Sequence, residues 1–212
     1  MKNPLHLSAI IAVAFGLGAL SLLAAGEDLS LKWFASISTA SFGTGLAILA
    51  FDKVLWRIPY LQEWFVTRPH LAGQWKIELI SMWNDPQTGL SPAPIAGTAT
   101  ITQTHSEFHM HVETDESEGD LIEGSIVRKK DGAYQVVGVY LNQPKVSVRD
   151  RSAMHHGAMM LDVVGDPNSP SKLKGSYWTE RRSVGEFRAT QIYRGVKGKR
   201  RKAARILVMS VG

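Results

Sequence analysis

The chain contains no cysteine among its 212 residues, so it can form no disulfide bond, no thiolate metal site and no thiol nucleophile. The motifs of several large enzyme classes are also absent: there is no G-x-S-x-G, no Walker loop, no H-E-x-x-H and no G-x-G-x-x-G. Its glutamates are scattered over separate predicted strands, with nothing that pairs them for acid–base chemistry. We therefore expect a protein that is not an enzyme.

Histidines offer little to a metal ion. His109 and His111 stand two residues apart in a predicted strand, a spacing at which two side chains can bind one metal, but no third ligand is evident. They alternate with Phe108, Met110 and Val112, which form the apolar face of that strand. We expect both histidines to face water and expect no metal site.

Acidic residues are missing from the C-terminal tail. From Arg194 onward the chain has seven Lys and Arg and no Asp or Glu, whereas residues 1–193 carry 17 Lys and Arg against 19 Asp and Glu. The net charge of +5 therefore belongs to the tail, which we assign to residues 196–212. Such tails are usually solvated or attract anionic surfaces without specificity, and we expect no specific binding of DNA or RNA.

Charged residues are also missing from two stretches near the N-terminus, residues 5–25 and 33–51. About 20 apolar residues in a helix cross a bilayer. The alternative for the first stretch is a cleaved signal peptide, although its apolar region is longer than usual, and the alternative for the second is a buried helix. We expect residues 1–52 to form a hairpin of two transmembrane helices, at 5–25 and 33–51, followed by an interfacial linker at 53–70.

The distribution of Lys and Arg around these stretches predicts an orientation. Lys2 precedes the first stretch, and Lys53, Arg57 and Arg68 follow the second, whereas the segment between them holds only Lys32 beside two acidic residues. Positive residues remain on the cytoplasmic side of a membrane. Both termini, and the domain that follows the hairpin, are therefore expected in the cytoplasm.

From residue 71 to residue 195 the pattern changes to alternation of apolar and polar residues, which predicts half-buried strands. Eight such segments follow one another without a helical pattern between them, and Asp131-Gly132 is typical of a hairpin turn. Glycines inside the strands favour a barrel over the alternative, a sandwich. Gly73-Gln74-Trp75 resembles the G-x-W of lipocalins, in which the Trp closes one end. The predicted fold class is a membrane-anchored all-β protein: a two-helix transmembrane hairpin and an eight-stranded antiparallel up-and-down barrel, lipocalin-like.

Aromatic and polar residues gather in the second half of the predicted barrel. Tyr140 and Asn142 share one face of a strand, and so do Tyr177 and Thr179. An aromatic ring can stack on a base, an amide can bind its edge and an arginine can bind phosphate. Alternatively, the tyrosines fill the core and the arginines lie in a solvated turn, and the residues alone leave both interpretations open. The candidate ligand-binding residues are Tyr140, Asn142, His156, Tyr177, Thr179, Arg181 and Arg182.

The chain resembles the two-transmembrane β-barrel effectors of bacterial CBASS antiphage systems, which are encoded beside a cyclic-oligonucleotide synthase. The resemblance extends over nearly the whole chain and rests on the order and spacing of five short segments behind the apolar stretches. These segments are LAGQW (71–75), ITQT (101–104), YLNQP (140–144), HHG (155–157) and LKGSYWTERRSVG (173–185).

This resemblance implies a receptor that kills the infected cell. The cytoplasmic barrel would bind a cyclic dinucleotide from a partner nucleotidyltransferase, and the protein would then form a homo-oligomer and disrupt the lipid bilayer of the inner membrane. It also implies ligand contacts for the seven candidate residues, with the cyclic dinucleotide as activating ligand and no cofactor. Two alternatives are a membrane-anchored lipocalin-like carrier of a small apolar ligand and a scaffold whose barrel has no pocket.

Overall fold

The computed structural model describes Gly16 and residues 31–62, 66, 68–84, 89–166 and 169–193. The chain forms two compact units, Met1–Trp56 and Arg57–Gly212. The first contains a helix of 23 residues, α2 (Leu31–Lys53). A short 3₁₀ turn, η1 (Leu55–Arg57), and a single helical turn, α3 (Pro59–Gln62), follow it.

The predicted transmembrane hairpin is wrong. Apart from Gly16, the expected helix at 5–25 lies outside the described residues. In the described part of the chain, α2 is the one helix of more than a single turn, and no helix there is long and apolar enough to cross a membrane. The physical reason is composition: α2 lacks charge in its middle, but five Ser and Thr and two Gly stand where a span needs large apolar side chains.

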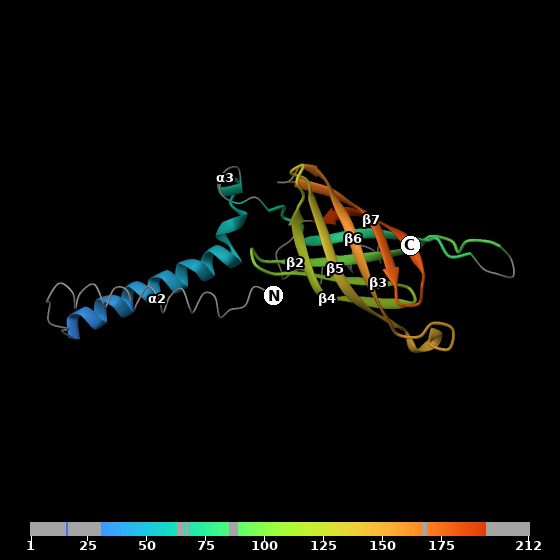
Figure 1. Cartoon of the computed structure of the whole chain (residues 1–212), viewed down its shortest axis with the longest axis horizontal. Helices are drawn as coiled ribbons and strands as arrows, with labels where there is room; N and C mark the ends of the chain where they lie inside the picture. Colours follow the sequence, from blue (N-terminus) through green and yellow to red (C-terminus); the bar gives the residue numbers. More distant parts are fainter. Residues whose placement is uncertain are drawn as a thin grey trace, which may run out of the picture. The chain divides into compact units, whose positions relative to one another are not determined.

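Eight antiparallel strands form a closed barrel in sequence order, and β1 also pairs with β8. Figure 1 shows the strands winding side by side around the barrel. This pairing confirms the predicted eight-stranded up-and-down barrel and rules out a sandwich, because no strand has a free edge. The strands are β1 (Gly73–Ser81), β2 (Ile95–Gln103), β3 (Phe108–Thr114), β4 (Ser117–Arg128), β5 (Tyr134–Pro144), β6 (His155–Asp166), β7 (Ser169–Thr179) and β8 (Val184–Tyr193).

Local sequence sets the turns that join these strands. Between β4 and β5, Gly132 adopts a positive φ of 87° and its N–H donates to the carbonyl of Lys129 at 3.0 Å. The N–H of Lys129 donates in turn to the carbonyl of Ala133 at 2.7 Å, which closes the hairpin predicted from Asp131-Gly132.

Alternation along each strand places every second side chain inside the barrel. The innermost side chains, with less than 2% of their surface exposed, include Trp75, Ile77, Met110, Leu161 and Leu173. Full burial of an apolar side chain of this size contributes roughly 1.5–3 kcal/mol relative to exposure. Since these residues come from four different strands, they hold the barrel together as one core.

His109 and His111 lie on the outer face of β3, and the two side chains are 51% and 28% exposed. Nδ1 of His111 lies 2.7 Å from a carboxylate oxygen of Asp120 on β4, which explains why this histidine is the less exposed. Among the described residues, no group of three or more His, Cys, Asp or Glu could hold a metal ion.

One end of the barrel is closed by the segment that precedes β1. The indole Nε1 of Trp75, a fully buried residue, donates to the carbonyl of Leu71 at 3.0 Å. The buried Gln103 side chain then ties this segment to β2, since its Oε1 accepts from Leu71 N at 2.8 Å and its Nε2 donates to Pro69 O at 2.9 Å. Arg57 also donates to the carbonyl of Gln103 at 2.8 Å. Trp75 thus fills the interior at this end of the barrel.

We predict that Gln103→Ala destabilises the barrel by about 1–3 kcal/mol, because it leaves a buried N–H and a buried carbonyl without partners. Urea unfolding of the full chain measures this. Gln143→Ala is the matched control, since Gln143 is an exposed glutamine on β5, and it should change the free energy of unfolding by less than about 0.5 kcal/mol. Equal effects of the two substitutions would contradict the role given to Gln103.

Candidate ligand-binding site

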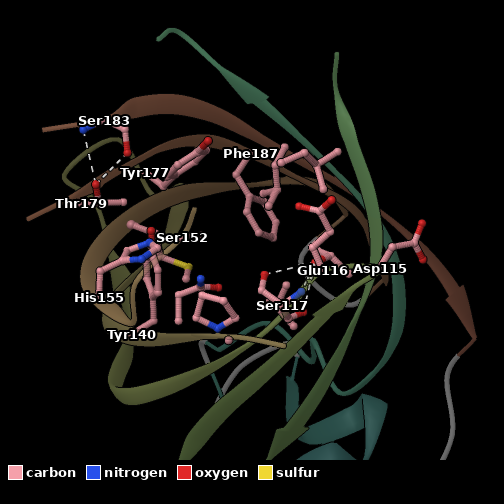
Figure 2. A pocket seen from close by; sticks show the side chains of 18 of the residues that line it. Asp115, Glu116, Ser117, Tyr140, Ser152, His155, Tyr177, Thr179, Ser183 and Phe187 are labelled. Atoms are coloured by element: carbon pink, nitrogen blue, oxygen red, sulfur yellow. Dashed lines mark hydrogen bonds between the residues drawn. The ribbon is translucent and has the colours of Figure 1, made fainter. Parts of the chain in front are cut away.

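The barrel is hollow at the end opposite Trp75. A cavity of about 630 Å³ lies there, and its lining comes from the strand ends and from the loops that join β1 to β2, β3 to β4, β5 to β6 and β7 to β8. Figure 2 shows side chains from these elements converging on one space. Ligand pockets for small molecules commonly have volumes of about 300–1,000 Å³, so the cavity can hold a ligand of several rings.

The lining combines an apolar floor with polar walls. The floor includes Met110, Leu121, Met159 and Phe187. Among the described lining residues there are two carboxylates and one histidine, but no lysine or arginine. The polar and tyrosine side chains of the lining are Thr114, Asp115, Glu116, Ser117, Tyr140, Asn142, Ser152, His155, Tyr177, Thr179 and Ser183.

Two tyrosines reach the cavity because glycines on the next strands leave room for their rings. A Cβ atom at Gly157 would clash with the ring of Tyr140 and would lie 2.7 Å from the carbonyl oxygen of Trp178. At Gly185, a Cβ atom would lie 2.5 Å from the hydroxyl oxygen of Tyr177. The cross-strand pair of Tyr140 and Gly157 thus makes a ring-on-backbone contact that no larger residue at position 157 permits.

The same environment keeps both phenols protonated. Burial raises the pKa of Tyr140 far above its usual value, and the nearby Tyr177 raises it further. Burial also raises the pKa of Tyr177, while a hydrogen bond with Ser81 opposes that rise. Near neutral pH the two side chains therefore present an uncharged aromatic face and a hydroxyl group that can donate a hydrogen bond.

The turn between β7 and β8 fixes Thr179 at the rim. Its hydroxyl lies 2.7 Å from that of Ser183, and its N–H donates to the carbonyl of Ser183 at 3.0 Å. Arg182 occupies the left-handed region with a φ of 61°, which lets this short turn reverse direction. Thr179 and Ser183 both line the cavity, whereas Arg182 does not.

Four of the seven predicted residues, Tyr140, Asn142, Tyr177 and Thr179, line the cavity together. Arg181 stands just outside it: its Nη1 donates to Ser152 Oγ at 3.0 Å and lies 3.5 Å from His155 Nδ1. The contacts of all seven with a ligand stay predictions.

The structure places His156 on the outer face of β6 and not in the cavity. Its N–H donates to a carboxylate oxygen of Glu180 at 2.8 Å, and its ring Nδ1 lies 3.5 Å from the other oxygen. This backbone hydrogen bond is the main reason why the pKa of Glu180 is lowered. The neighbouring His155 lines the cavity instead (Figure 2).

Sequence reasoning missed His155 and the residues that loops bring to the mouth. Strand parity could have found His155, because Gly157, Met159 and Leu161 follow it on the inward face of β6. Ser152 and Glu116 carry no such signal, since a loop and a turn place them.

The turn between β3 and β4 takes up only the first two residues of the acidic segment DESEGD (115–120). β4 already begins at Ser117, because its N–H donates to the Thr114 hydroxyl at 3.0 Å and that hydroxyl also contacts Ser117 O at 3.0 Å. Asp120 consequently lies in the strand, opposite His111. The tight turn puts Asp115 and Glu116 at the mouth of the cavity.

Fold and cavity together define a closed β-barrel of the up-and-down class with a cavity at one end. Within that class, residues 66–191 match the sequence model of a family described as "Cap15, cyclic dinucleotide receptor domain", and the chain belongs to this family. The chain is also similar to the CD-NTase-associated protein 15 of Yersinia aleksiciae, with 32% identity over 112 residues. That alignment covers 53% of this chain and 50% of the relative, so the chain spans about half the length of the curated relative it matches.

We predict that Gly157→Ala costs about 1–3 kcal/mol of stability, because the new methyl group displaces the Tyr140 ring or the backbone of β7. Thermal or urea unfolding measures the loss. Gly119→Ala serves as a control on β4: the nearest atom to its Cβ would lie 3.7 Å away, and its effect should remain within about 0.5 kcal/mol. A Gly157→Ala protein as stable as the wild type would show that the ring contact does not constrain the site.

We also predict a pH dependence that comes from Tyr140. Because its folded-state pKa is raised, its contribution to stability is complete below the unfolded pKa of about 10 and is lost as the pH rises above that value. Tyr140→Phe should therefore flatten the decline of unfolding free energy above pH 10 or so. Urea unfolding at a series of alkaline pH values tests this, and identical slopes for the two proteins would refute it.

Proposed function

We propose that this protein is a CBASS antiphage effector whose barrel binds a cyclic dinucleotide made by a partner nucleotidyltransferase. The observation that carries the proposal is the cavity itself, with two tyrosines and an amide at its mouth, inside a barrel of the cyclic dinucleotide receptor family. The scaffold alternative predicts a barrel without a pocket, and the cavity argues against it.

The shape and chemistry of the cavity suit two linked nucleotides. Its volume of about 630 Å³ lies within the range of small-molecule sites. Tyr140 and Tyr177 offer rings for stacking on bases, and each stacked base contributes about 1–3 kcal/mol. Asn142 offers both a donor and an acceptor to a base edge.

The phosphates are expected at the rim and not on the floor. No lysine or arginine occurs among the described lining residues, whereas Arg181 and Arg151 contact lining residues from outside, Ser152 and Glu116 respectively. An arginine binds phosphate best through charge-assisted hydrogen bonds. The ligand would therefore enter with its bases first and leave its phosphodiester ring near these arginines.

The proposal includes an action on the inner membrane, with the barrel in the cytoplasm. Ligand binding would favour a homo-oligomer whose assembly disrupts the bilayer, as the resemblance to CBASS effectors implies. A shift of the active form from 1% to 99% would need about 5.5 kcal/mol of preferential binding to the assembled state.

A carrier of a small apolar ligand is the second candidate. Met110, Leu121, Met159 and Phe187 form an apolar floor that such a ligand would fill. Carboxylates and hydroxyls surround that floor, and they favour a ligand that also makes hydrogen bonds.

We predict that the full chain binds at least one of c-di-AMP, c-di-GMP, 3′,3′-cyclic GMP–AMP and c-di-UMP, measured by isothermal titration calorimetry. Tyr177→Ala should weaken binding on the order of tenfold or more, because a stacking face is lost, while Tyr177→Phe should retain most of the affinity. Arg181→Ala should weaken binding, and Arg188→Ala should not, because Arg188 pairs with Glu186 on the outer face of β8.

Two results would count against this assignment. If none of the four compounds binds a well-folded chain, the receptor function fails. If a fatty acid binds instead and is displaced by none of them, the carrier function replaces it.

A further inference from the structure

Glu116 occupies an unusual place for a site that receives an anion. It lies at the tip of the β3–β4 turn, and three contacts tie that turn to the loop before β6. Lys145 N donates to Glu116 O at 2.8 Å, Lys145 Nζ donates to Thr114 O at 3.3 Å, and Arg151 Nη2 lies 2.5 Å from Glu116 Oε1. The turn is thus held in one position at the mouth.

The carboxylate retains capacity to accept hydrogen bonds. Arg151 contacts Oε1 alone, and within the described part of the chain Oε2 of Glu116 has no hydrogen-bond partner. Figure 2 shows the side chain of Glu116 turned into the cavity near the ring of Phe187. A carboxylate inside the site can only accept hydrogen bonds, so it requires a ligand edge that donates them.

We infer that Glu116 selects the base, and that the site takes cyclic dinucleotides that contain at least one guanine. The inference rests on the proposed function and specifies the ligand of that same cavity. The opposite walls would then have different tasks: Tyr140 and Tyr177 stack on the bases, and Glu116 binds the donor edge of one of them.

Base chemistry leads to guanine in particular. Its Watson–Crick edge presents two adjacent donors, N1–H and N2–H, which match the two oxygens of a carboxylate. Adenine presents one donor beside the acceptor N1, and uracil presents one donor between two carbonyl oxygens. Both would bring a lone pair against the carboxylate, and a well-formed bidentate pair discriminates by about 1–3 kcal/mol between bases.

Arg151 supports the recognition of the base by Glu116 in two ways. Its ion pair with Glu116 keeps that carboxylate oriented at the mouth, and its position there brings positive charge toward the phosphates. The pair is more than half exposed, so it is weak enough to rearrange as a ligand enters. Arg151 is therefore a positioning residue and Glu116 the specificity-determining one.

The experiment compares affinities of the full chain for c-di-GMP, 3′,3′-cyclic GMP–AMP, c-di-AMP and c-di-UMP by isothermal titration calorimetry. The two guanine-containing compounds should bind on the order of tenfold more tightly than c-di-AMP and c-di-UMP. Glu116→Gln should abolish that preference or turn it toward adenine, because an amide offers one acceptor and one donor.

Two variants separate base selection from other effects. Glu118→Gln removes a nearby carboxylate, on an exposed residue of β4 that does not line the cavity, and should keep the guanine preference. Arg151→Met breaks the ion pair but leaves the carboxylate, so it should weaken all four ligands to a similar extent and also keep the preference. Thermal unfolding of each variant without ligand verifies that the barrel is intact.

The outcomes are distinct. Tightest binding of c-di-AMP or c-di-UMP by the wild type, or a guanine preference that survives Glu116→Gln, overturns the inference while the receptor function stands. Loss of the preference in Arg151→Met as much as in Glu116→Gln also overturns it, because discrimination then comes from the ion pair. Failure of all four compounds to bind overturns the receptor function and this inference with it.

Discussion

The pairing of β1 with β8 is the constraint on which the rest of the structure depends. It removes both sheet edges and converts a two-sided sheet into a wall with an inside and an outside. In the closed barrel, the alternation along each strand decides whether a side chain points into the interior or outward. Tyr140 and Tyr177 point inward because they share parity with the buried Val136 on β5 and Leu173 on β7.

The two ends of this closed wall differ because of side-chain volume. At one end Trp75 and Leu71 fill the interior, and Gln103 satisfies the backbone groups that this filling buries. At the other end Gly157 and Gly185 remove volume, so that tyrosine rings stand at the sides of a cavity and do not fill it. The same architecture therefore has a stable plug and an open site, in line with small barrels that hold one ligand.

Much of this barrel could be predicted from the sequence, since alternation and turn residues are local signals. They gave all eight strands, and parity brought Tyr140, Asn142, Tyr177 and Thr179 to one place. The residues at the mouth of the cavity could not be predicted in the same way. Glu116 reaches the mouth through a turn that is held by Thr114 and by a loop distant in sequence.

The incorrect prediction of a transmembrane hairpin near the N-terminus has a different cause. The expected span at 33–51 was inferred from missing charge, but a helix crosses a bilayer only when apolar side chains replace the charge. The Ser, Thr and Gly of α2 carry no charge, but they are not the apolar side chains that a membrane-spanning helix needs. The prediction therefore gave more weight to the lack of charged residues than to the shortage of large apolar side chains.

The charge of the site decides how a cyclic dinucleotide can be oriented in it. Two carboxylates in the lining repel phosphate, and the arginines lie outside the cavity at its rim. An anion without bases would gain little from entering, because burial of its charge would find no cation on the floor. A ligand with bases can stack on the tyrosines and satisfy a carboxylate while its phosphates stay in water. We therefore expect selectivity against simple phosphates to come from repulsion inside the cavity as much as from attraction at its rim.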